Sequence, residues 1–332
     1  MNELDETKNT GVFITAPREE DLQVGDVNPT IQNASADWRQ YECDGEWQKE
    51  MQINFETEAC MSFTPVNAIA TYLNWLIQTQ QIQPAQLAFL QGNGYIGADG
   101  KVALSPRFTA TMDGTTINGN DFQHPWNSVQ NDGLVPDSMW PMPADQMNAN
   151  PANAWKIYYA TPTADVIALG KQFLTMFKVN WHWLVSNGGG ASQSEFQIWL
   201  KTAPIHVAVA VGSPWNVATP INACGCGAAH GVLLTNVEIG VVNNILDHYA
   251  PFSKQLSADY CLAYAVQGWV EQIPQVAPVS PAQTIQEAIP AVHEAIQNLA
   301  TLAPQVEQQH ATLIQQWIDA LTALLKTIHI SG

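Results

Sequence analysis

The sequence predicts an α+β fold in which a helical part precedes an antiparallel β part. In residues 59–79, apolar side chains recur every three or four positions, which is the spacing of a helix with one buried face. In the second half, segments 205–211, 230–238, 243–251 and 260–270 are rich in β-branched residues and are separated by turns, as strands are. Helices grouped before strands are typical of an α+β protein with two lobes.

The composition limits the class of protein and its partners. The chain has 332 residues, 46% of them hydrophobic, so it can bury at least one large core. Its 30 Asp and Glu against 12 Lys and Arg give a net charge of -18, which excludes nucleic-acid binding through phosphate contacts and disfavours anionic membranes. No apolar run reaches the ~18 residues of a membrane span, and the N-terminus has no signal-peptide pattern. We expect synthesis in a cytoplasm, without a membrane span.

The chain divides into four predicted regions. Residues 1–50 are acidic and turn-rich and predict an extended N-terminal arm, either a structural clasp or a short propeptide. Residues 51–273 form the main domain. Residues 274–281, "PQVAPVSP", predict a stiff Pro-rich linker. Residues 282–330 predict a helical appendix.

Three further predictions concern secondary structure. Residues 90–150 are rich in Gly, Asn, Asp and Pro, which favours loops and short helices. Residues 164–186 predict a helix that ends in "MFKVNWHWLV". The appendix predicts a helical hairpin or a long kinked helix, with a kink at Pro290 and a new helix starting at Pro304. Its apolar stripe carries few charges and needs a partner, either the main domain or other subunits.

Cys60 is the first candidate for chemistry. It lies in "NFETEACMSFTPVNAI", at or just before the first turn of the predicted helix. A thiol at a helix N-terminus becomes a nucleophile when an imidazolium lies beside it. A buried core cysteine fits the same position.

His230 and Asp247 are the second candidates. His230 opens one predicted strand, and the next ends in "ILDHYAP", which places Asp247 where antiparallel pairing could bring its carboxylate against the imidazole. Such a carboxylate selects the tautomer and stabilises the cation. Six other histidines show no obvious orienting partner: His124, His182, His206, His293, His310 and His329.

Five segments in order resemble papain-like cysteine peptidases, and among them the divergent members encoded in phage genomes. They are "FETEACMSFTPVNAI", "LSPRFTATMDGTTINGNDFQHPWNSVQNDGLVPDSMWP", "LKTAPIHVAV", "HGVLLTNVE" and "ILDHYAPFSKQL", and they cover roughly residues 50–270. The start "NTGVFITAPREEDLQVGD" is also similar to those phage proteins. The resemblance implies the papain-like two-lobe fold for residues 51–273.

The resemblance also implies roles for particular residues. Cys60 would be the nucleophile, His230 the general base and acid, and Asp247 the orienting residue. Asn54, six residues before the cysteine, takes the place of the family's oxyanion-hole glutamine, and Gln52 is the nearby substitute. No cofactor and no metal are implied.

The remaining cysteines allow three interpretations. Cys224, Cys226, Cys261 and His230 could hold a metal, but a C-x-C spacing is short for tetrahedral zinc. Five scattered cysteines do not predict a disulfide scaffold, so free thiols are the default. The resemblance instead places Cys224 and Cys261 where papain-like enzymes have a disulfide in the β lobe.

The tryptophans at Trp181, Trp183 and Trp215 fit either a core or a substrate cleft.

Three functions are compatible with these sequence features. The first is a cysteine peptidase or amidase, phage-encoded and virion-associated, acting on a protein or peptide. The second is a structural virion protein of a capsid or tail, whose papain-like domain is inactive or only secondarily catalytic and whose residues 282–330 bind further copies or other virion proteins. The third is a transglutaminase-like acyl transferase.

Overall fold

The computed structural model describes residues 12–17, 32–43, 55–211, 215, 220–222, 226–249, 251–275, 281–302 and 308–330. The chain forms two compact units, Met1–Ile273 and Pro274–Gly332, each considered by itself below. Among the described residues, no helix combines the length and the hydropathy needed to cross a bilayer.

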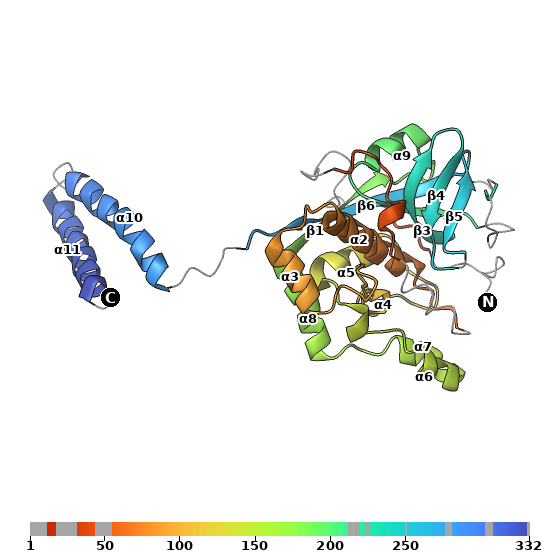
Figure 1. Ribbon diagram of the computed structural model, residues 1–332, viewed down its shortest axis with the longest axis horizontal. Helices are drawn as coiled ribbons and strands as arrows, with labels where there is room; N and C mark the ends of the chain where they lie inside the picture. Colours follow the sequence, from red (N-terminus) through yellow and green to blue (C-terminus); the bar gives the residue numbers. More distant parts are fainter. Residues whose placement is uncertain are drawn as a thin grey trace. The chain divides into compact units, whose positions relative to one another are not determined.

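The helices of the first unit come before its sheet. The longest, α2 (Cys60–Gln78), is buried along nearly its whole length because apolar and small residues surround it on every side. Figure 1 shows the following helices mostly gathered to one side of α2. They are α3 (Pro84–Gly92), α4 (Pro106–Met112), α5 (Gln123–Asp132), α6 (Ala144–Ala149), α7 (Ala154–Tyr158) and α8 (Ala164–Met176), with short 3-10 turns at Arg39–Tyr41, Asp137–Met139 and Pro151–Asn153.

The sheet has six strands in the order β1-β6-β2-β3-β4-β5, and every neighbouring pair is antiparallel. The strands are β1 (Phe177–Val185), β2 (Ile205–Val209), β3 (His230–Glu238), β4 (Val242–Leu246), β5 (Ser253–Ser257) and β6 (Leu262–Gln272), with α9 (Gln193–Trp199) between β1 and β2. The predicted α+β class, with helices first and an antiparallel sheet second, is therefore confirmed.

One predicted helix is wrong in its second half. The segment 164–186 is helical only as far as Met176, and 177–185 is the strand β1, paired with β6. Apolar residues occupy every second position from Phe177 to Val185, and those five side chains are buried. A period of two places them all on one face of a strand, whereas on a helix they would spread around the axis.

Two glycines allow the helices to lie close to the sheet. A Cβ on Gly231 of β3 would meet Met61 Sδ of α2 at 2.7 Å, and one on Gly268 of β6 would lie 2.2 Å from the ring of Trp126 in α5. Helix α2 packs against β3, β6 and β2. The N-terminus of α2 therefore comes against the start of β3.

The N-terminal residues that the structure describes pack against the rest of the first unit. Val12 forms a bridge with Asn120, and Trp38 is fully buried. The Trp38 indole donates to the carbonyl of Leu200 at 2.7 Å and its ring stacks on Tyr72 of α2. These contacts tie residues 32–43 to the main domain.

The second unit is a helical hairpin of α10 (Pro281–Leu302) and α11 (Gln308–Ile330), which contact each other. Of the two predicted arrangements, the hairpin is confirmed. Pro290 lies within α10. Pro304 and linker residues 276–280 lie outside the described residues.

Candidate active site

Cys60 is the first residue of α2, and its side chain is only 2% exposed. Ala59 precedes the helix and gives no side-chain cap, while its carbonyl accepts from Ser62 and Phe63. The first N–H groups of a helix point out of its N-terminus and carry partial positive charge. The thiol therefore lies where a thiolate is electrostatically stabilised.

His230 is the first residue of β3, opposite Val209 of β2, and it is completely buried. Asp247 directly follows β4, the next strand in the sheet. His230 Nε2 lies 2.8 Å from Asp247 Oδ1. Because the ionised carboxylate only accepts, Nε2 carries the proton. The two strands thus bring the imidazole and the carboxylate together at one end of the sheet.

His230 also interacts with Cys60. Its Nε2 bonds to Asp247, which leaves Nδ1 as the ring nitrogen for the thiol. Burial lowers the pKa of His230, but the charge and hydrogen bond of Asp247, together with a hydrogen bond and charge interaction with Cys60, raise it to about 10. His230 thus interacts with both other residues of the predicted Cys-His-Asp triad, Cys60 and Asp247.

Asp247 is surrounded by donors that sequence reasoning did not find. Lys254 Nζ of β5 and the indole N–H of Trp215 both donate to Oδ2 at 2.8 Å. The backbone N–H of Tyr249 donates to Oδ1 at 3.3 Å. Burial alone would raise the pKa of Asp247, but the positive charges of Lys254 and His230 hold it well below its usual range. The carboxylate is therefore ionised although it is 1% exposed.

His248 and Tyr249 complete the surroundings. The His248 ring stacks on Phe63 at 4.9 Å and lies 5.0 Å from the ring of His230. Burial, followed by the charge of His230, lowers the pKa of His248 to about 3, so this ring is neutral. The Tyr249 hydroxyl donates to the carboxylate of Glu56, which lies four residues before the cysteine. This bond joins the segment before α2 to the turn after β4.

The donor atoms of His230, Asp247 and His248 lie within 4.8 Å of one another, close enough to be tested as a metal site. Lys254 places an ammonium 2.8 Å from the same carboxylate. A divalent cation would have to share Asp247 with that charge and break its bond to His230. These residues therefore do not fit a metal.

The cysteine predictions need correction. Cys226 and Cys261 form a disulfide, so they are neither free thiols nor zinc ligands. The bond joins the segment before β3 to the residue before β6. The resemblance implied Cys224 as the partner of Cys261, whereas the observed partner is Cys226, two residues later in the sequence. Cys224 itself lies outside the described residues.

Other predicted site residues have different outcomes. Asn54 and Gln52 lie outside the described residues, so the oxyanion role stays a prediction. Trp181 and Trp183 are buried in β1, and the cleft prediction is wrong for them. Trp215 is buried, with its ring perpendicular to that of His230 and the two ring centroids 5.6 Å apart. It holds Asp247 instead of lining an open cleft.

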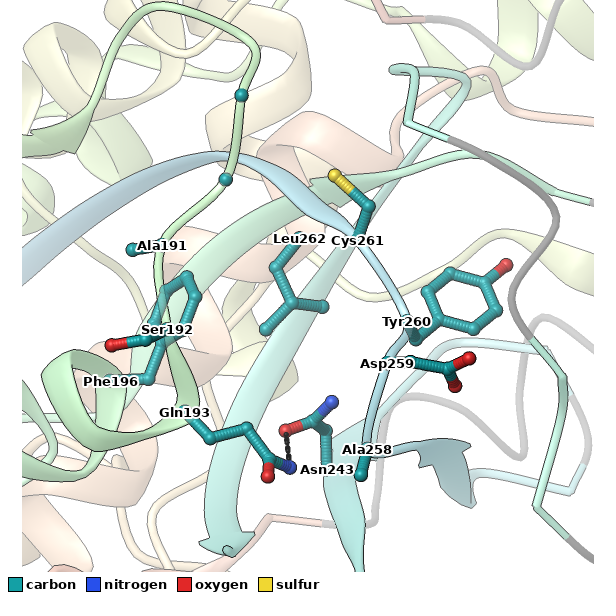
Figure 2. A pocket seen from close by; sticks show the side chains of 12 residues that line it. Ala191, Ser192, Gln193, Phe196, Asn243, Ala258, Asp259, Tyr260, Cys261 and Leu262 are labelled. Carbon is teal, nitrogen blue, oxygen red and sulfur yellow. Dashed lines mark hydrogen bonds between the residues drawn. The ribbon is translucent and has the colours of Figure 1, made fainter. Parts of the chain in front are cut away.

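The hollow drawn in Figure 2 is separate from the triad. It encloses about 270 Å³ beside the Cys226–Cys261 disulfide, and its lining includes Gln193, Asn243 and Asp259. Gln193 Nε2 donates to Asn243 Oδ1 at 2.9 Å across it. No triad residue lines it.

Comparison with known proteins gives similarity to solved structures alone. No protein-family model matches the chain, and no curated protein matches it. The structure is similar to that of the bromelain protease from Ananas comosus in complex with the E64 inhibitor, with 13% sequence identity and a TM-score of 0.45 over 71% of this chain and 98% of bromelain. The functional argument below therefore depends on the geometry of this chain alone.

Proposed function

We propose that this chain is a cysteine peptidase or amidase of the papain-like kind. The observation that carries the proposal is the buried imidazole of His230, hydrogen-bonded to Asp247 on one side and interacting with Cys60 on the other. A thiolate stabilised by an imidazolium and a helix N-terminus attacks carbonyl carbons.

The chemistry follows from these positions. In the resting pair, the proton of the Cys60 thiol has already passed to His230 Nδ1, and the thiolate sulfur attacks the amide carbonyl to form a tetrahedral oxyanion. The backbone N–H of Cys60 is the proposed first donor to that oxyanion, and Asn54 is the predicted second donor. Collapse breaks the C–N bond, and His230 returns its proton to the leaving amine. Water then attacks the thioester, His230 takes the water proton, and collapse releases the acid and restores the thiolate.

The burial of Cys60 has a consequence for substrate access. With the thiol 2% exposed, a carbonyl carbon reaches Sγ only after neighbouring groups move. The bond between Glu56 and Tyr249 joins the two sides of the site and would have to yield. We therefore propose that an extended peptide enters between the segment before α2 and the turn after β4. A virion protein, a host protein or a cell-wall peptide crosslink would each meet this description.

Cys43 supplies a control within the same chain. It is the other described free cysteine, and its exposure of 8% exceeds that of Cys60. Its thiol hydrogen-bonds to Asn67 Oδ1, whereas Cys60 interacts with His230. If reactivity followed exposure, Cys43 would react first; if it followed activation, Cys60 would.

The test is alkylation of the native full-length protein with iodoacetamide across pH 4 to 9, followed by peptide mapping. We expect Cys60 to react faster than Cys43 across this range. His230→Ala should remove this advantage, and Cys43→Ser should leave it intact. A Cys60 that reacts only after unfolding would refute the proposal. Incorporation of an amine in place of hydrolysis would indicate an acyl transferase.

A second candidate function is that of a virion building block that assembles through the hairpin. On α11, Leu313, Trp317 and Leu324 recur at helical spacing and are 56%, 64% and 56% exposed. Two helices alone are too short to bury such a stripe. Self-association of the full chain that is lost in Trp317→Ser, but kept in the neighbouring exposed variant Gln315→Ser, would support this candidate. A monomeric wild-type chain would refute self-association.

A further inference from the structure

Lys254 is an unusual residue for its position. It lies on the short strand β5, yet its side chain is completely buried. Its ammonium lies 2.8 Å from Asp247 Oδ2 and donates to the carbonyl of Tyr249 at 2.5 Å, with the ring of Trp215 5.7 Å away. Lysine is almost never fully buried, because removing an ammonium from water costs several kcal/mol. Every polar contact that compensates this cost is at the triad carboxylate or beside it.

The ammonium is one of a small set of charges in this closed space. Asp247 is the anion that it contacts, and His230 is the second cation on the same carboxylate. His248 Nδ1 lies 3.5 Å from Oδ1 but is neutral. The titratable groups around Asp247 and His230 include Cys60 of α2, Glu56 before it, His206 of β2, and His248 and Tyr249 after β4.

Each ionised group has a definite effect on the imidazole. Asp247, at 2.8 Å, stabilises the His230 cation. Cys60 stabilises the same cation while the thiolate exists. In a buried space, these two anions would hold the proton on the imidazole so firmly that it would be a poor acid. Lys254 opposes them, because a positive charge on the far oxygen of Asp247 repels the imidazolium.

During turnover, His230 must both gain a proton from the thiol and lose it to the leaving amine. A general acid works best when its pKa is close to the working pH. A carboxylate paired with an ammonium presents the imidazole with an acceptor of nearly zero net charge. It therefore orients the ring through the hydrogen bond and holds the proton less tightly than an unpaired carboxylate would.

We propose that Lys254 is a positioning residue of the triad, which fixes Asp247 through Oδ2 and offsets its charge so that His230 can release its proton. The inference rests on the proposed hydrolase function and concerns the regulation of the same site. The Trp215 indole N–H fixes the same oxygen without adding charge, so the two donors have separable roles.

The test follows the ionisation of His230 directly, by NMR of isotope-labelled histidine rings in the full chain, with the His230 signal assigned from a His230→Gln variant. In Lys254→Met, we expect the His230 midpoint to move upward by about 1–3 pH units, because a neighbouring cation is lost. Lys178→Met is the matched control. That lysine is exposed on β1 and pairs with Glu271 at 3.8 Å, so its loss should leave the midpoint unchanged.

A second background keeps the test decisive if Lys254→Met does not fold. Asp247→Asn leaves Lys254 as the only fixed charge of the pair and should lower the His230 midpoint. Adding Lys254→Met to Asp247→Asn removes both charges of the pair, and proteins tolerate the loss of a whole buried ion pair better than the loss of one partner. Relative to Asp247→Asn alone, the double variant should raise the His230 midpoint by at least about one unit. If Lys254→Met leaves the His230 midpoint unmoved in the wild type or in Asp247→Asn, the proposal is overturned and Lys254 is only a member of a structural ion pair.

The outcomes separate this inference from the proposed function. A shifted His230 midpoint together with an unreactive Cys60 would support the role of Lys254 on the imidazole and refute the hydrolase. A reactive Cys60 together with an unmoved midpoint would support the hydrolase and refute the role of Lys254.

Discussion

The contact between the start of α2 and the start of β3 decides whether Cys60 and His230 meet, and Gly231 allows that contact. A Cβ at position 231 would lie 2.7 Å from Met61 Sδ, 3.1 Å from His206 Nε2 and 3.5 Å from the carbonyl of Cys60. Met61 is fully buried, so its side chain cannot swing into solvent. Gly231→Ala should therefore push the first turn of α2 away from β3.

The expected size of this effect follows from the overlap. Overpacking of a filled core typically costs about 1–3 kcal/mol, and we expect that loss in the free energy of unfolding. A displacement of the thiol by even a fraction of an ångström from His230 should also slow Cys60 alkylation, by about 10- to 100-fold. Urea denaturation measures the first quantity and iodoacetamide mapping the second.

Gly227→Ala is the matched control. It lies three residues before the strand, and a Cβ there would make an ordinary contact of 3.6 Å with Ala210. This variant should match the wild type in both assays. If Gly231→Ala is equally stable and equally reactive, α2 and β3 do not meet as described, and the triad argument loses its geometric basis.

Three further predictions concern stability. Trp215→Phe removes one donor to the Asp247 carboxylate and should lower the free energy of unfolding by about 1.5–3 kcal/mol in urea denaturation, and an unchanged midpoint would contradict the bond. Burial raises the pKa of Asp113 to about 6, above its unfolded value of 3.8. The free energy of unfolding should therefore fall as the pH rises from about 4 to about 6, and Asp113→Asn should abolish that slope. The Cys226–Cys261 disulfide closes a separation of 35 residues, so its reduction should cost about 3–4 kcal/mol, measured by denaturation with and without reductant; equal midpoints would contradict the bond.

The sequence predicts those parts of the fold in which periodicity is strong over many residues. The helix expected at 59–79 is observed at Cys60–Gln78, and the strand expected at 230–238 is observed at His230–Glu238. The error at 164–186 arose where a helical spacing passes directly into a spacing of two, with no Gly or Pro at the boundary. Strand β5, "SKQLS", is short and polar, so no periodic signal marks it.

The site shows the same division between local and non-local information. Cys60, His230 and Asp247 each stand at the end of an element, and a helix start or a strand end is visible in the sequence. Lys254 and Trp215 are brought to Asp247 by the turn between β4 and β5 and by the segment between β2 and β3. Neither connecting segment has a sequence pattern that predicts which of its side chains points toward Asp247.

The burial of Cys60 fits both a core thiol and a nucleophile, but the buried charges beside it separate the two. A fold that needed only a core at this place would be at least as stable with apolar residues of similar volume, because buried ion pairs seldom repay their desolvation. Here an ionised Asp247 lies with a histidine and a lysine in a space closed to water. Buried ion pairs of this kind add little stability, so we propose that the arrangement acts on the proton on His230. A structural cysteine has no use for that proton, whereas a nucleophile depends on it.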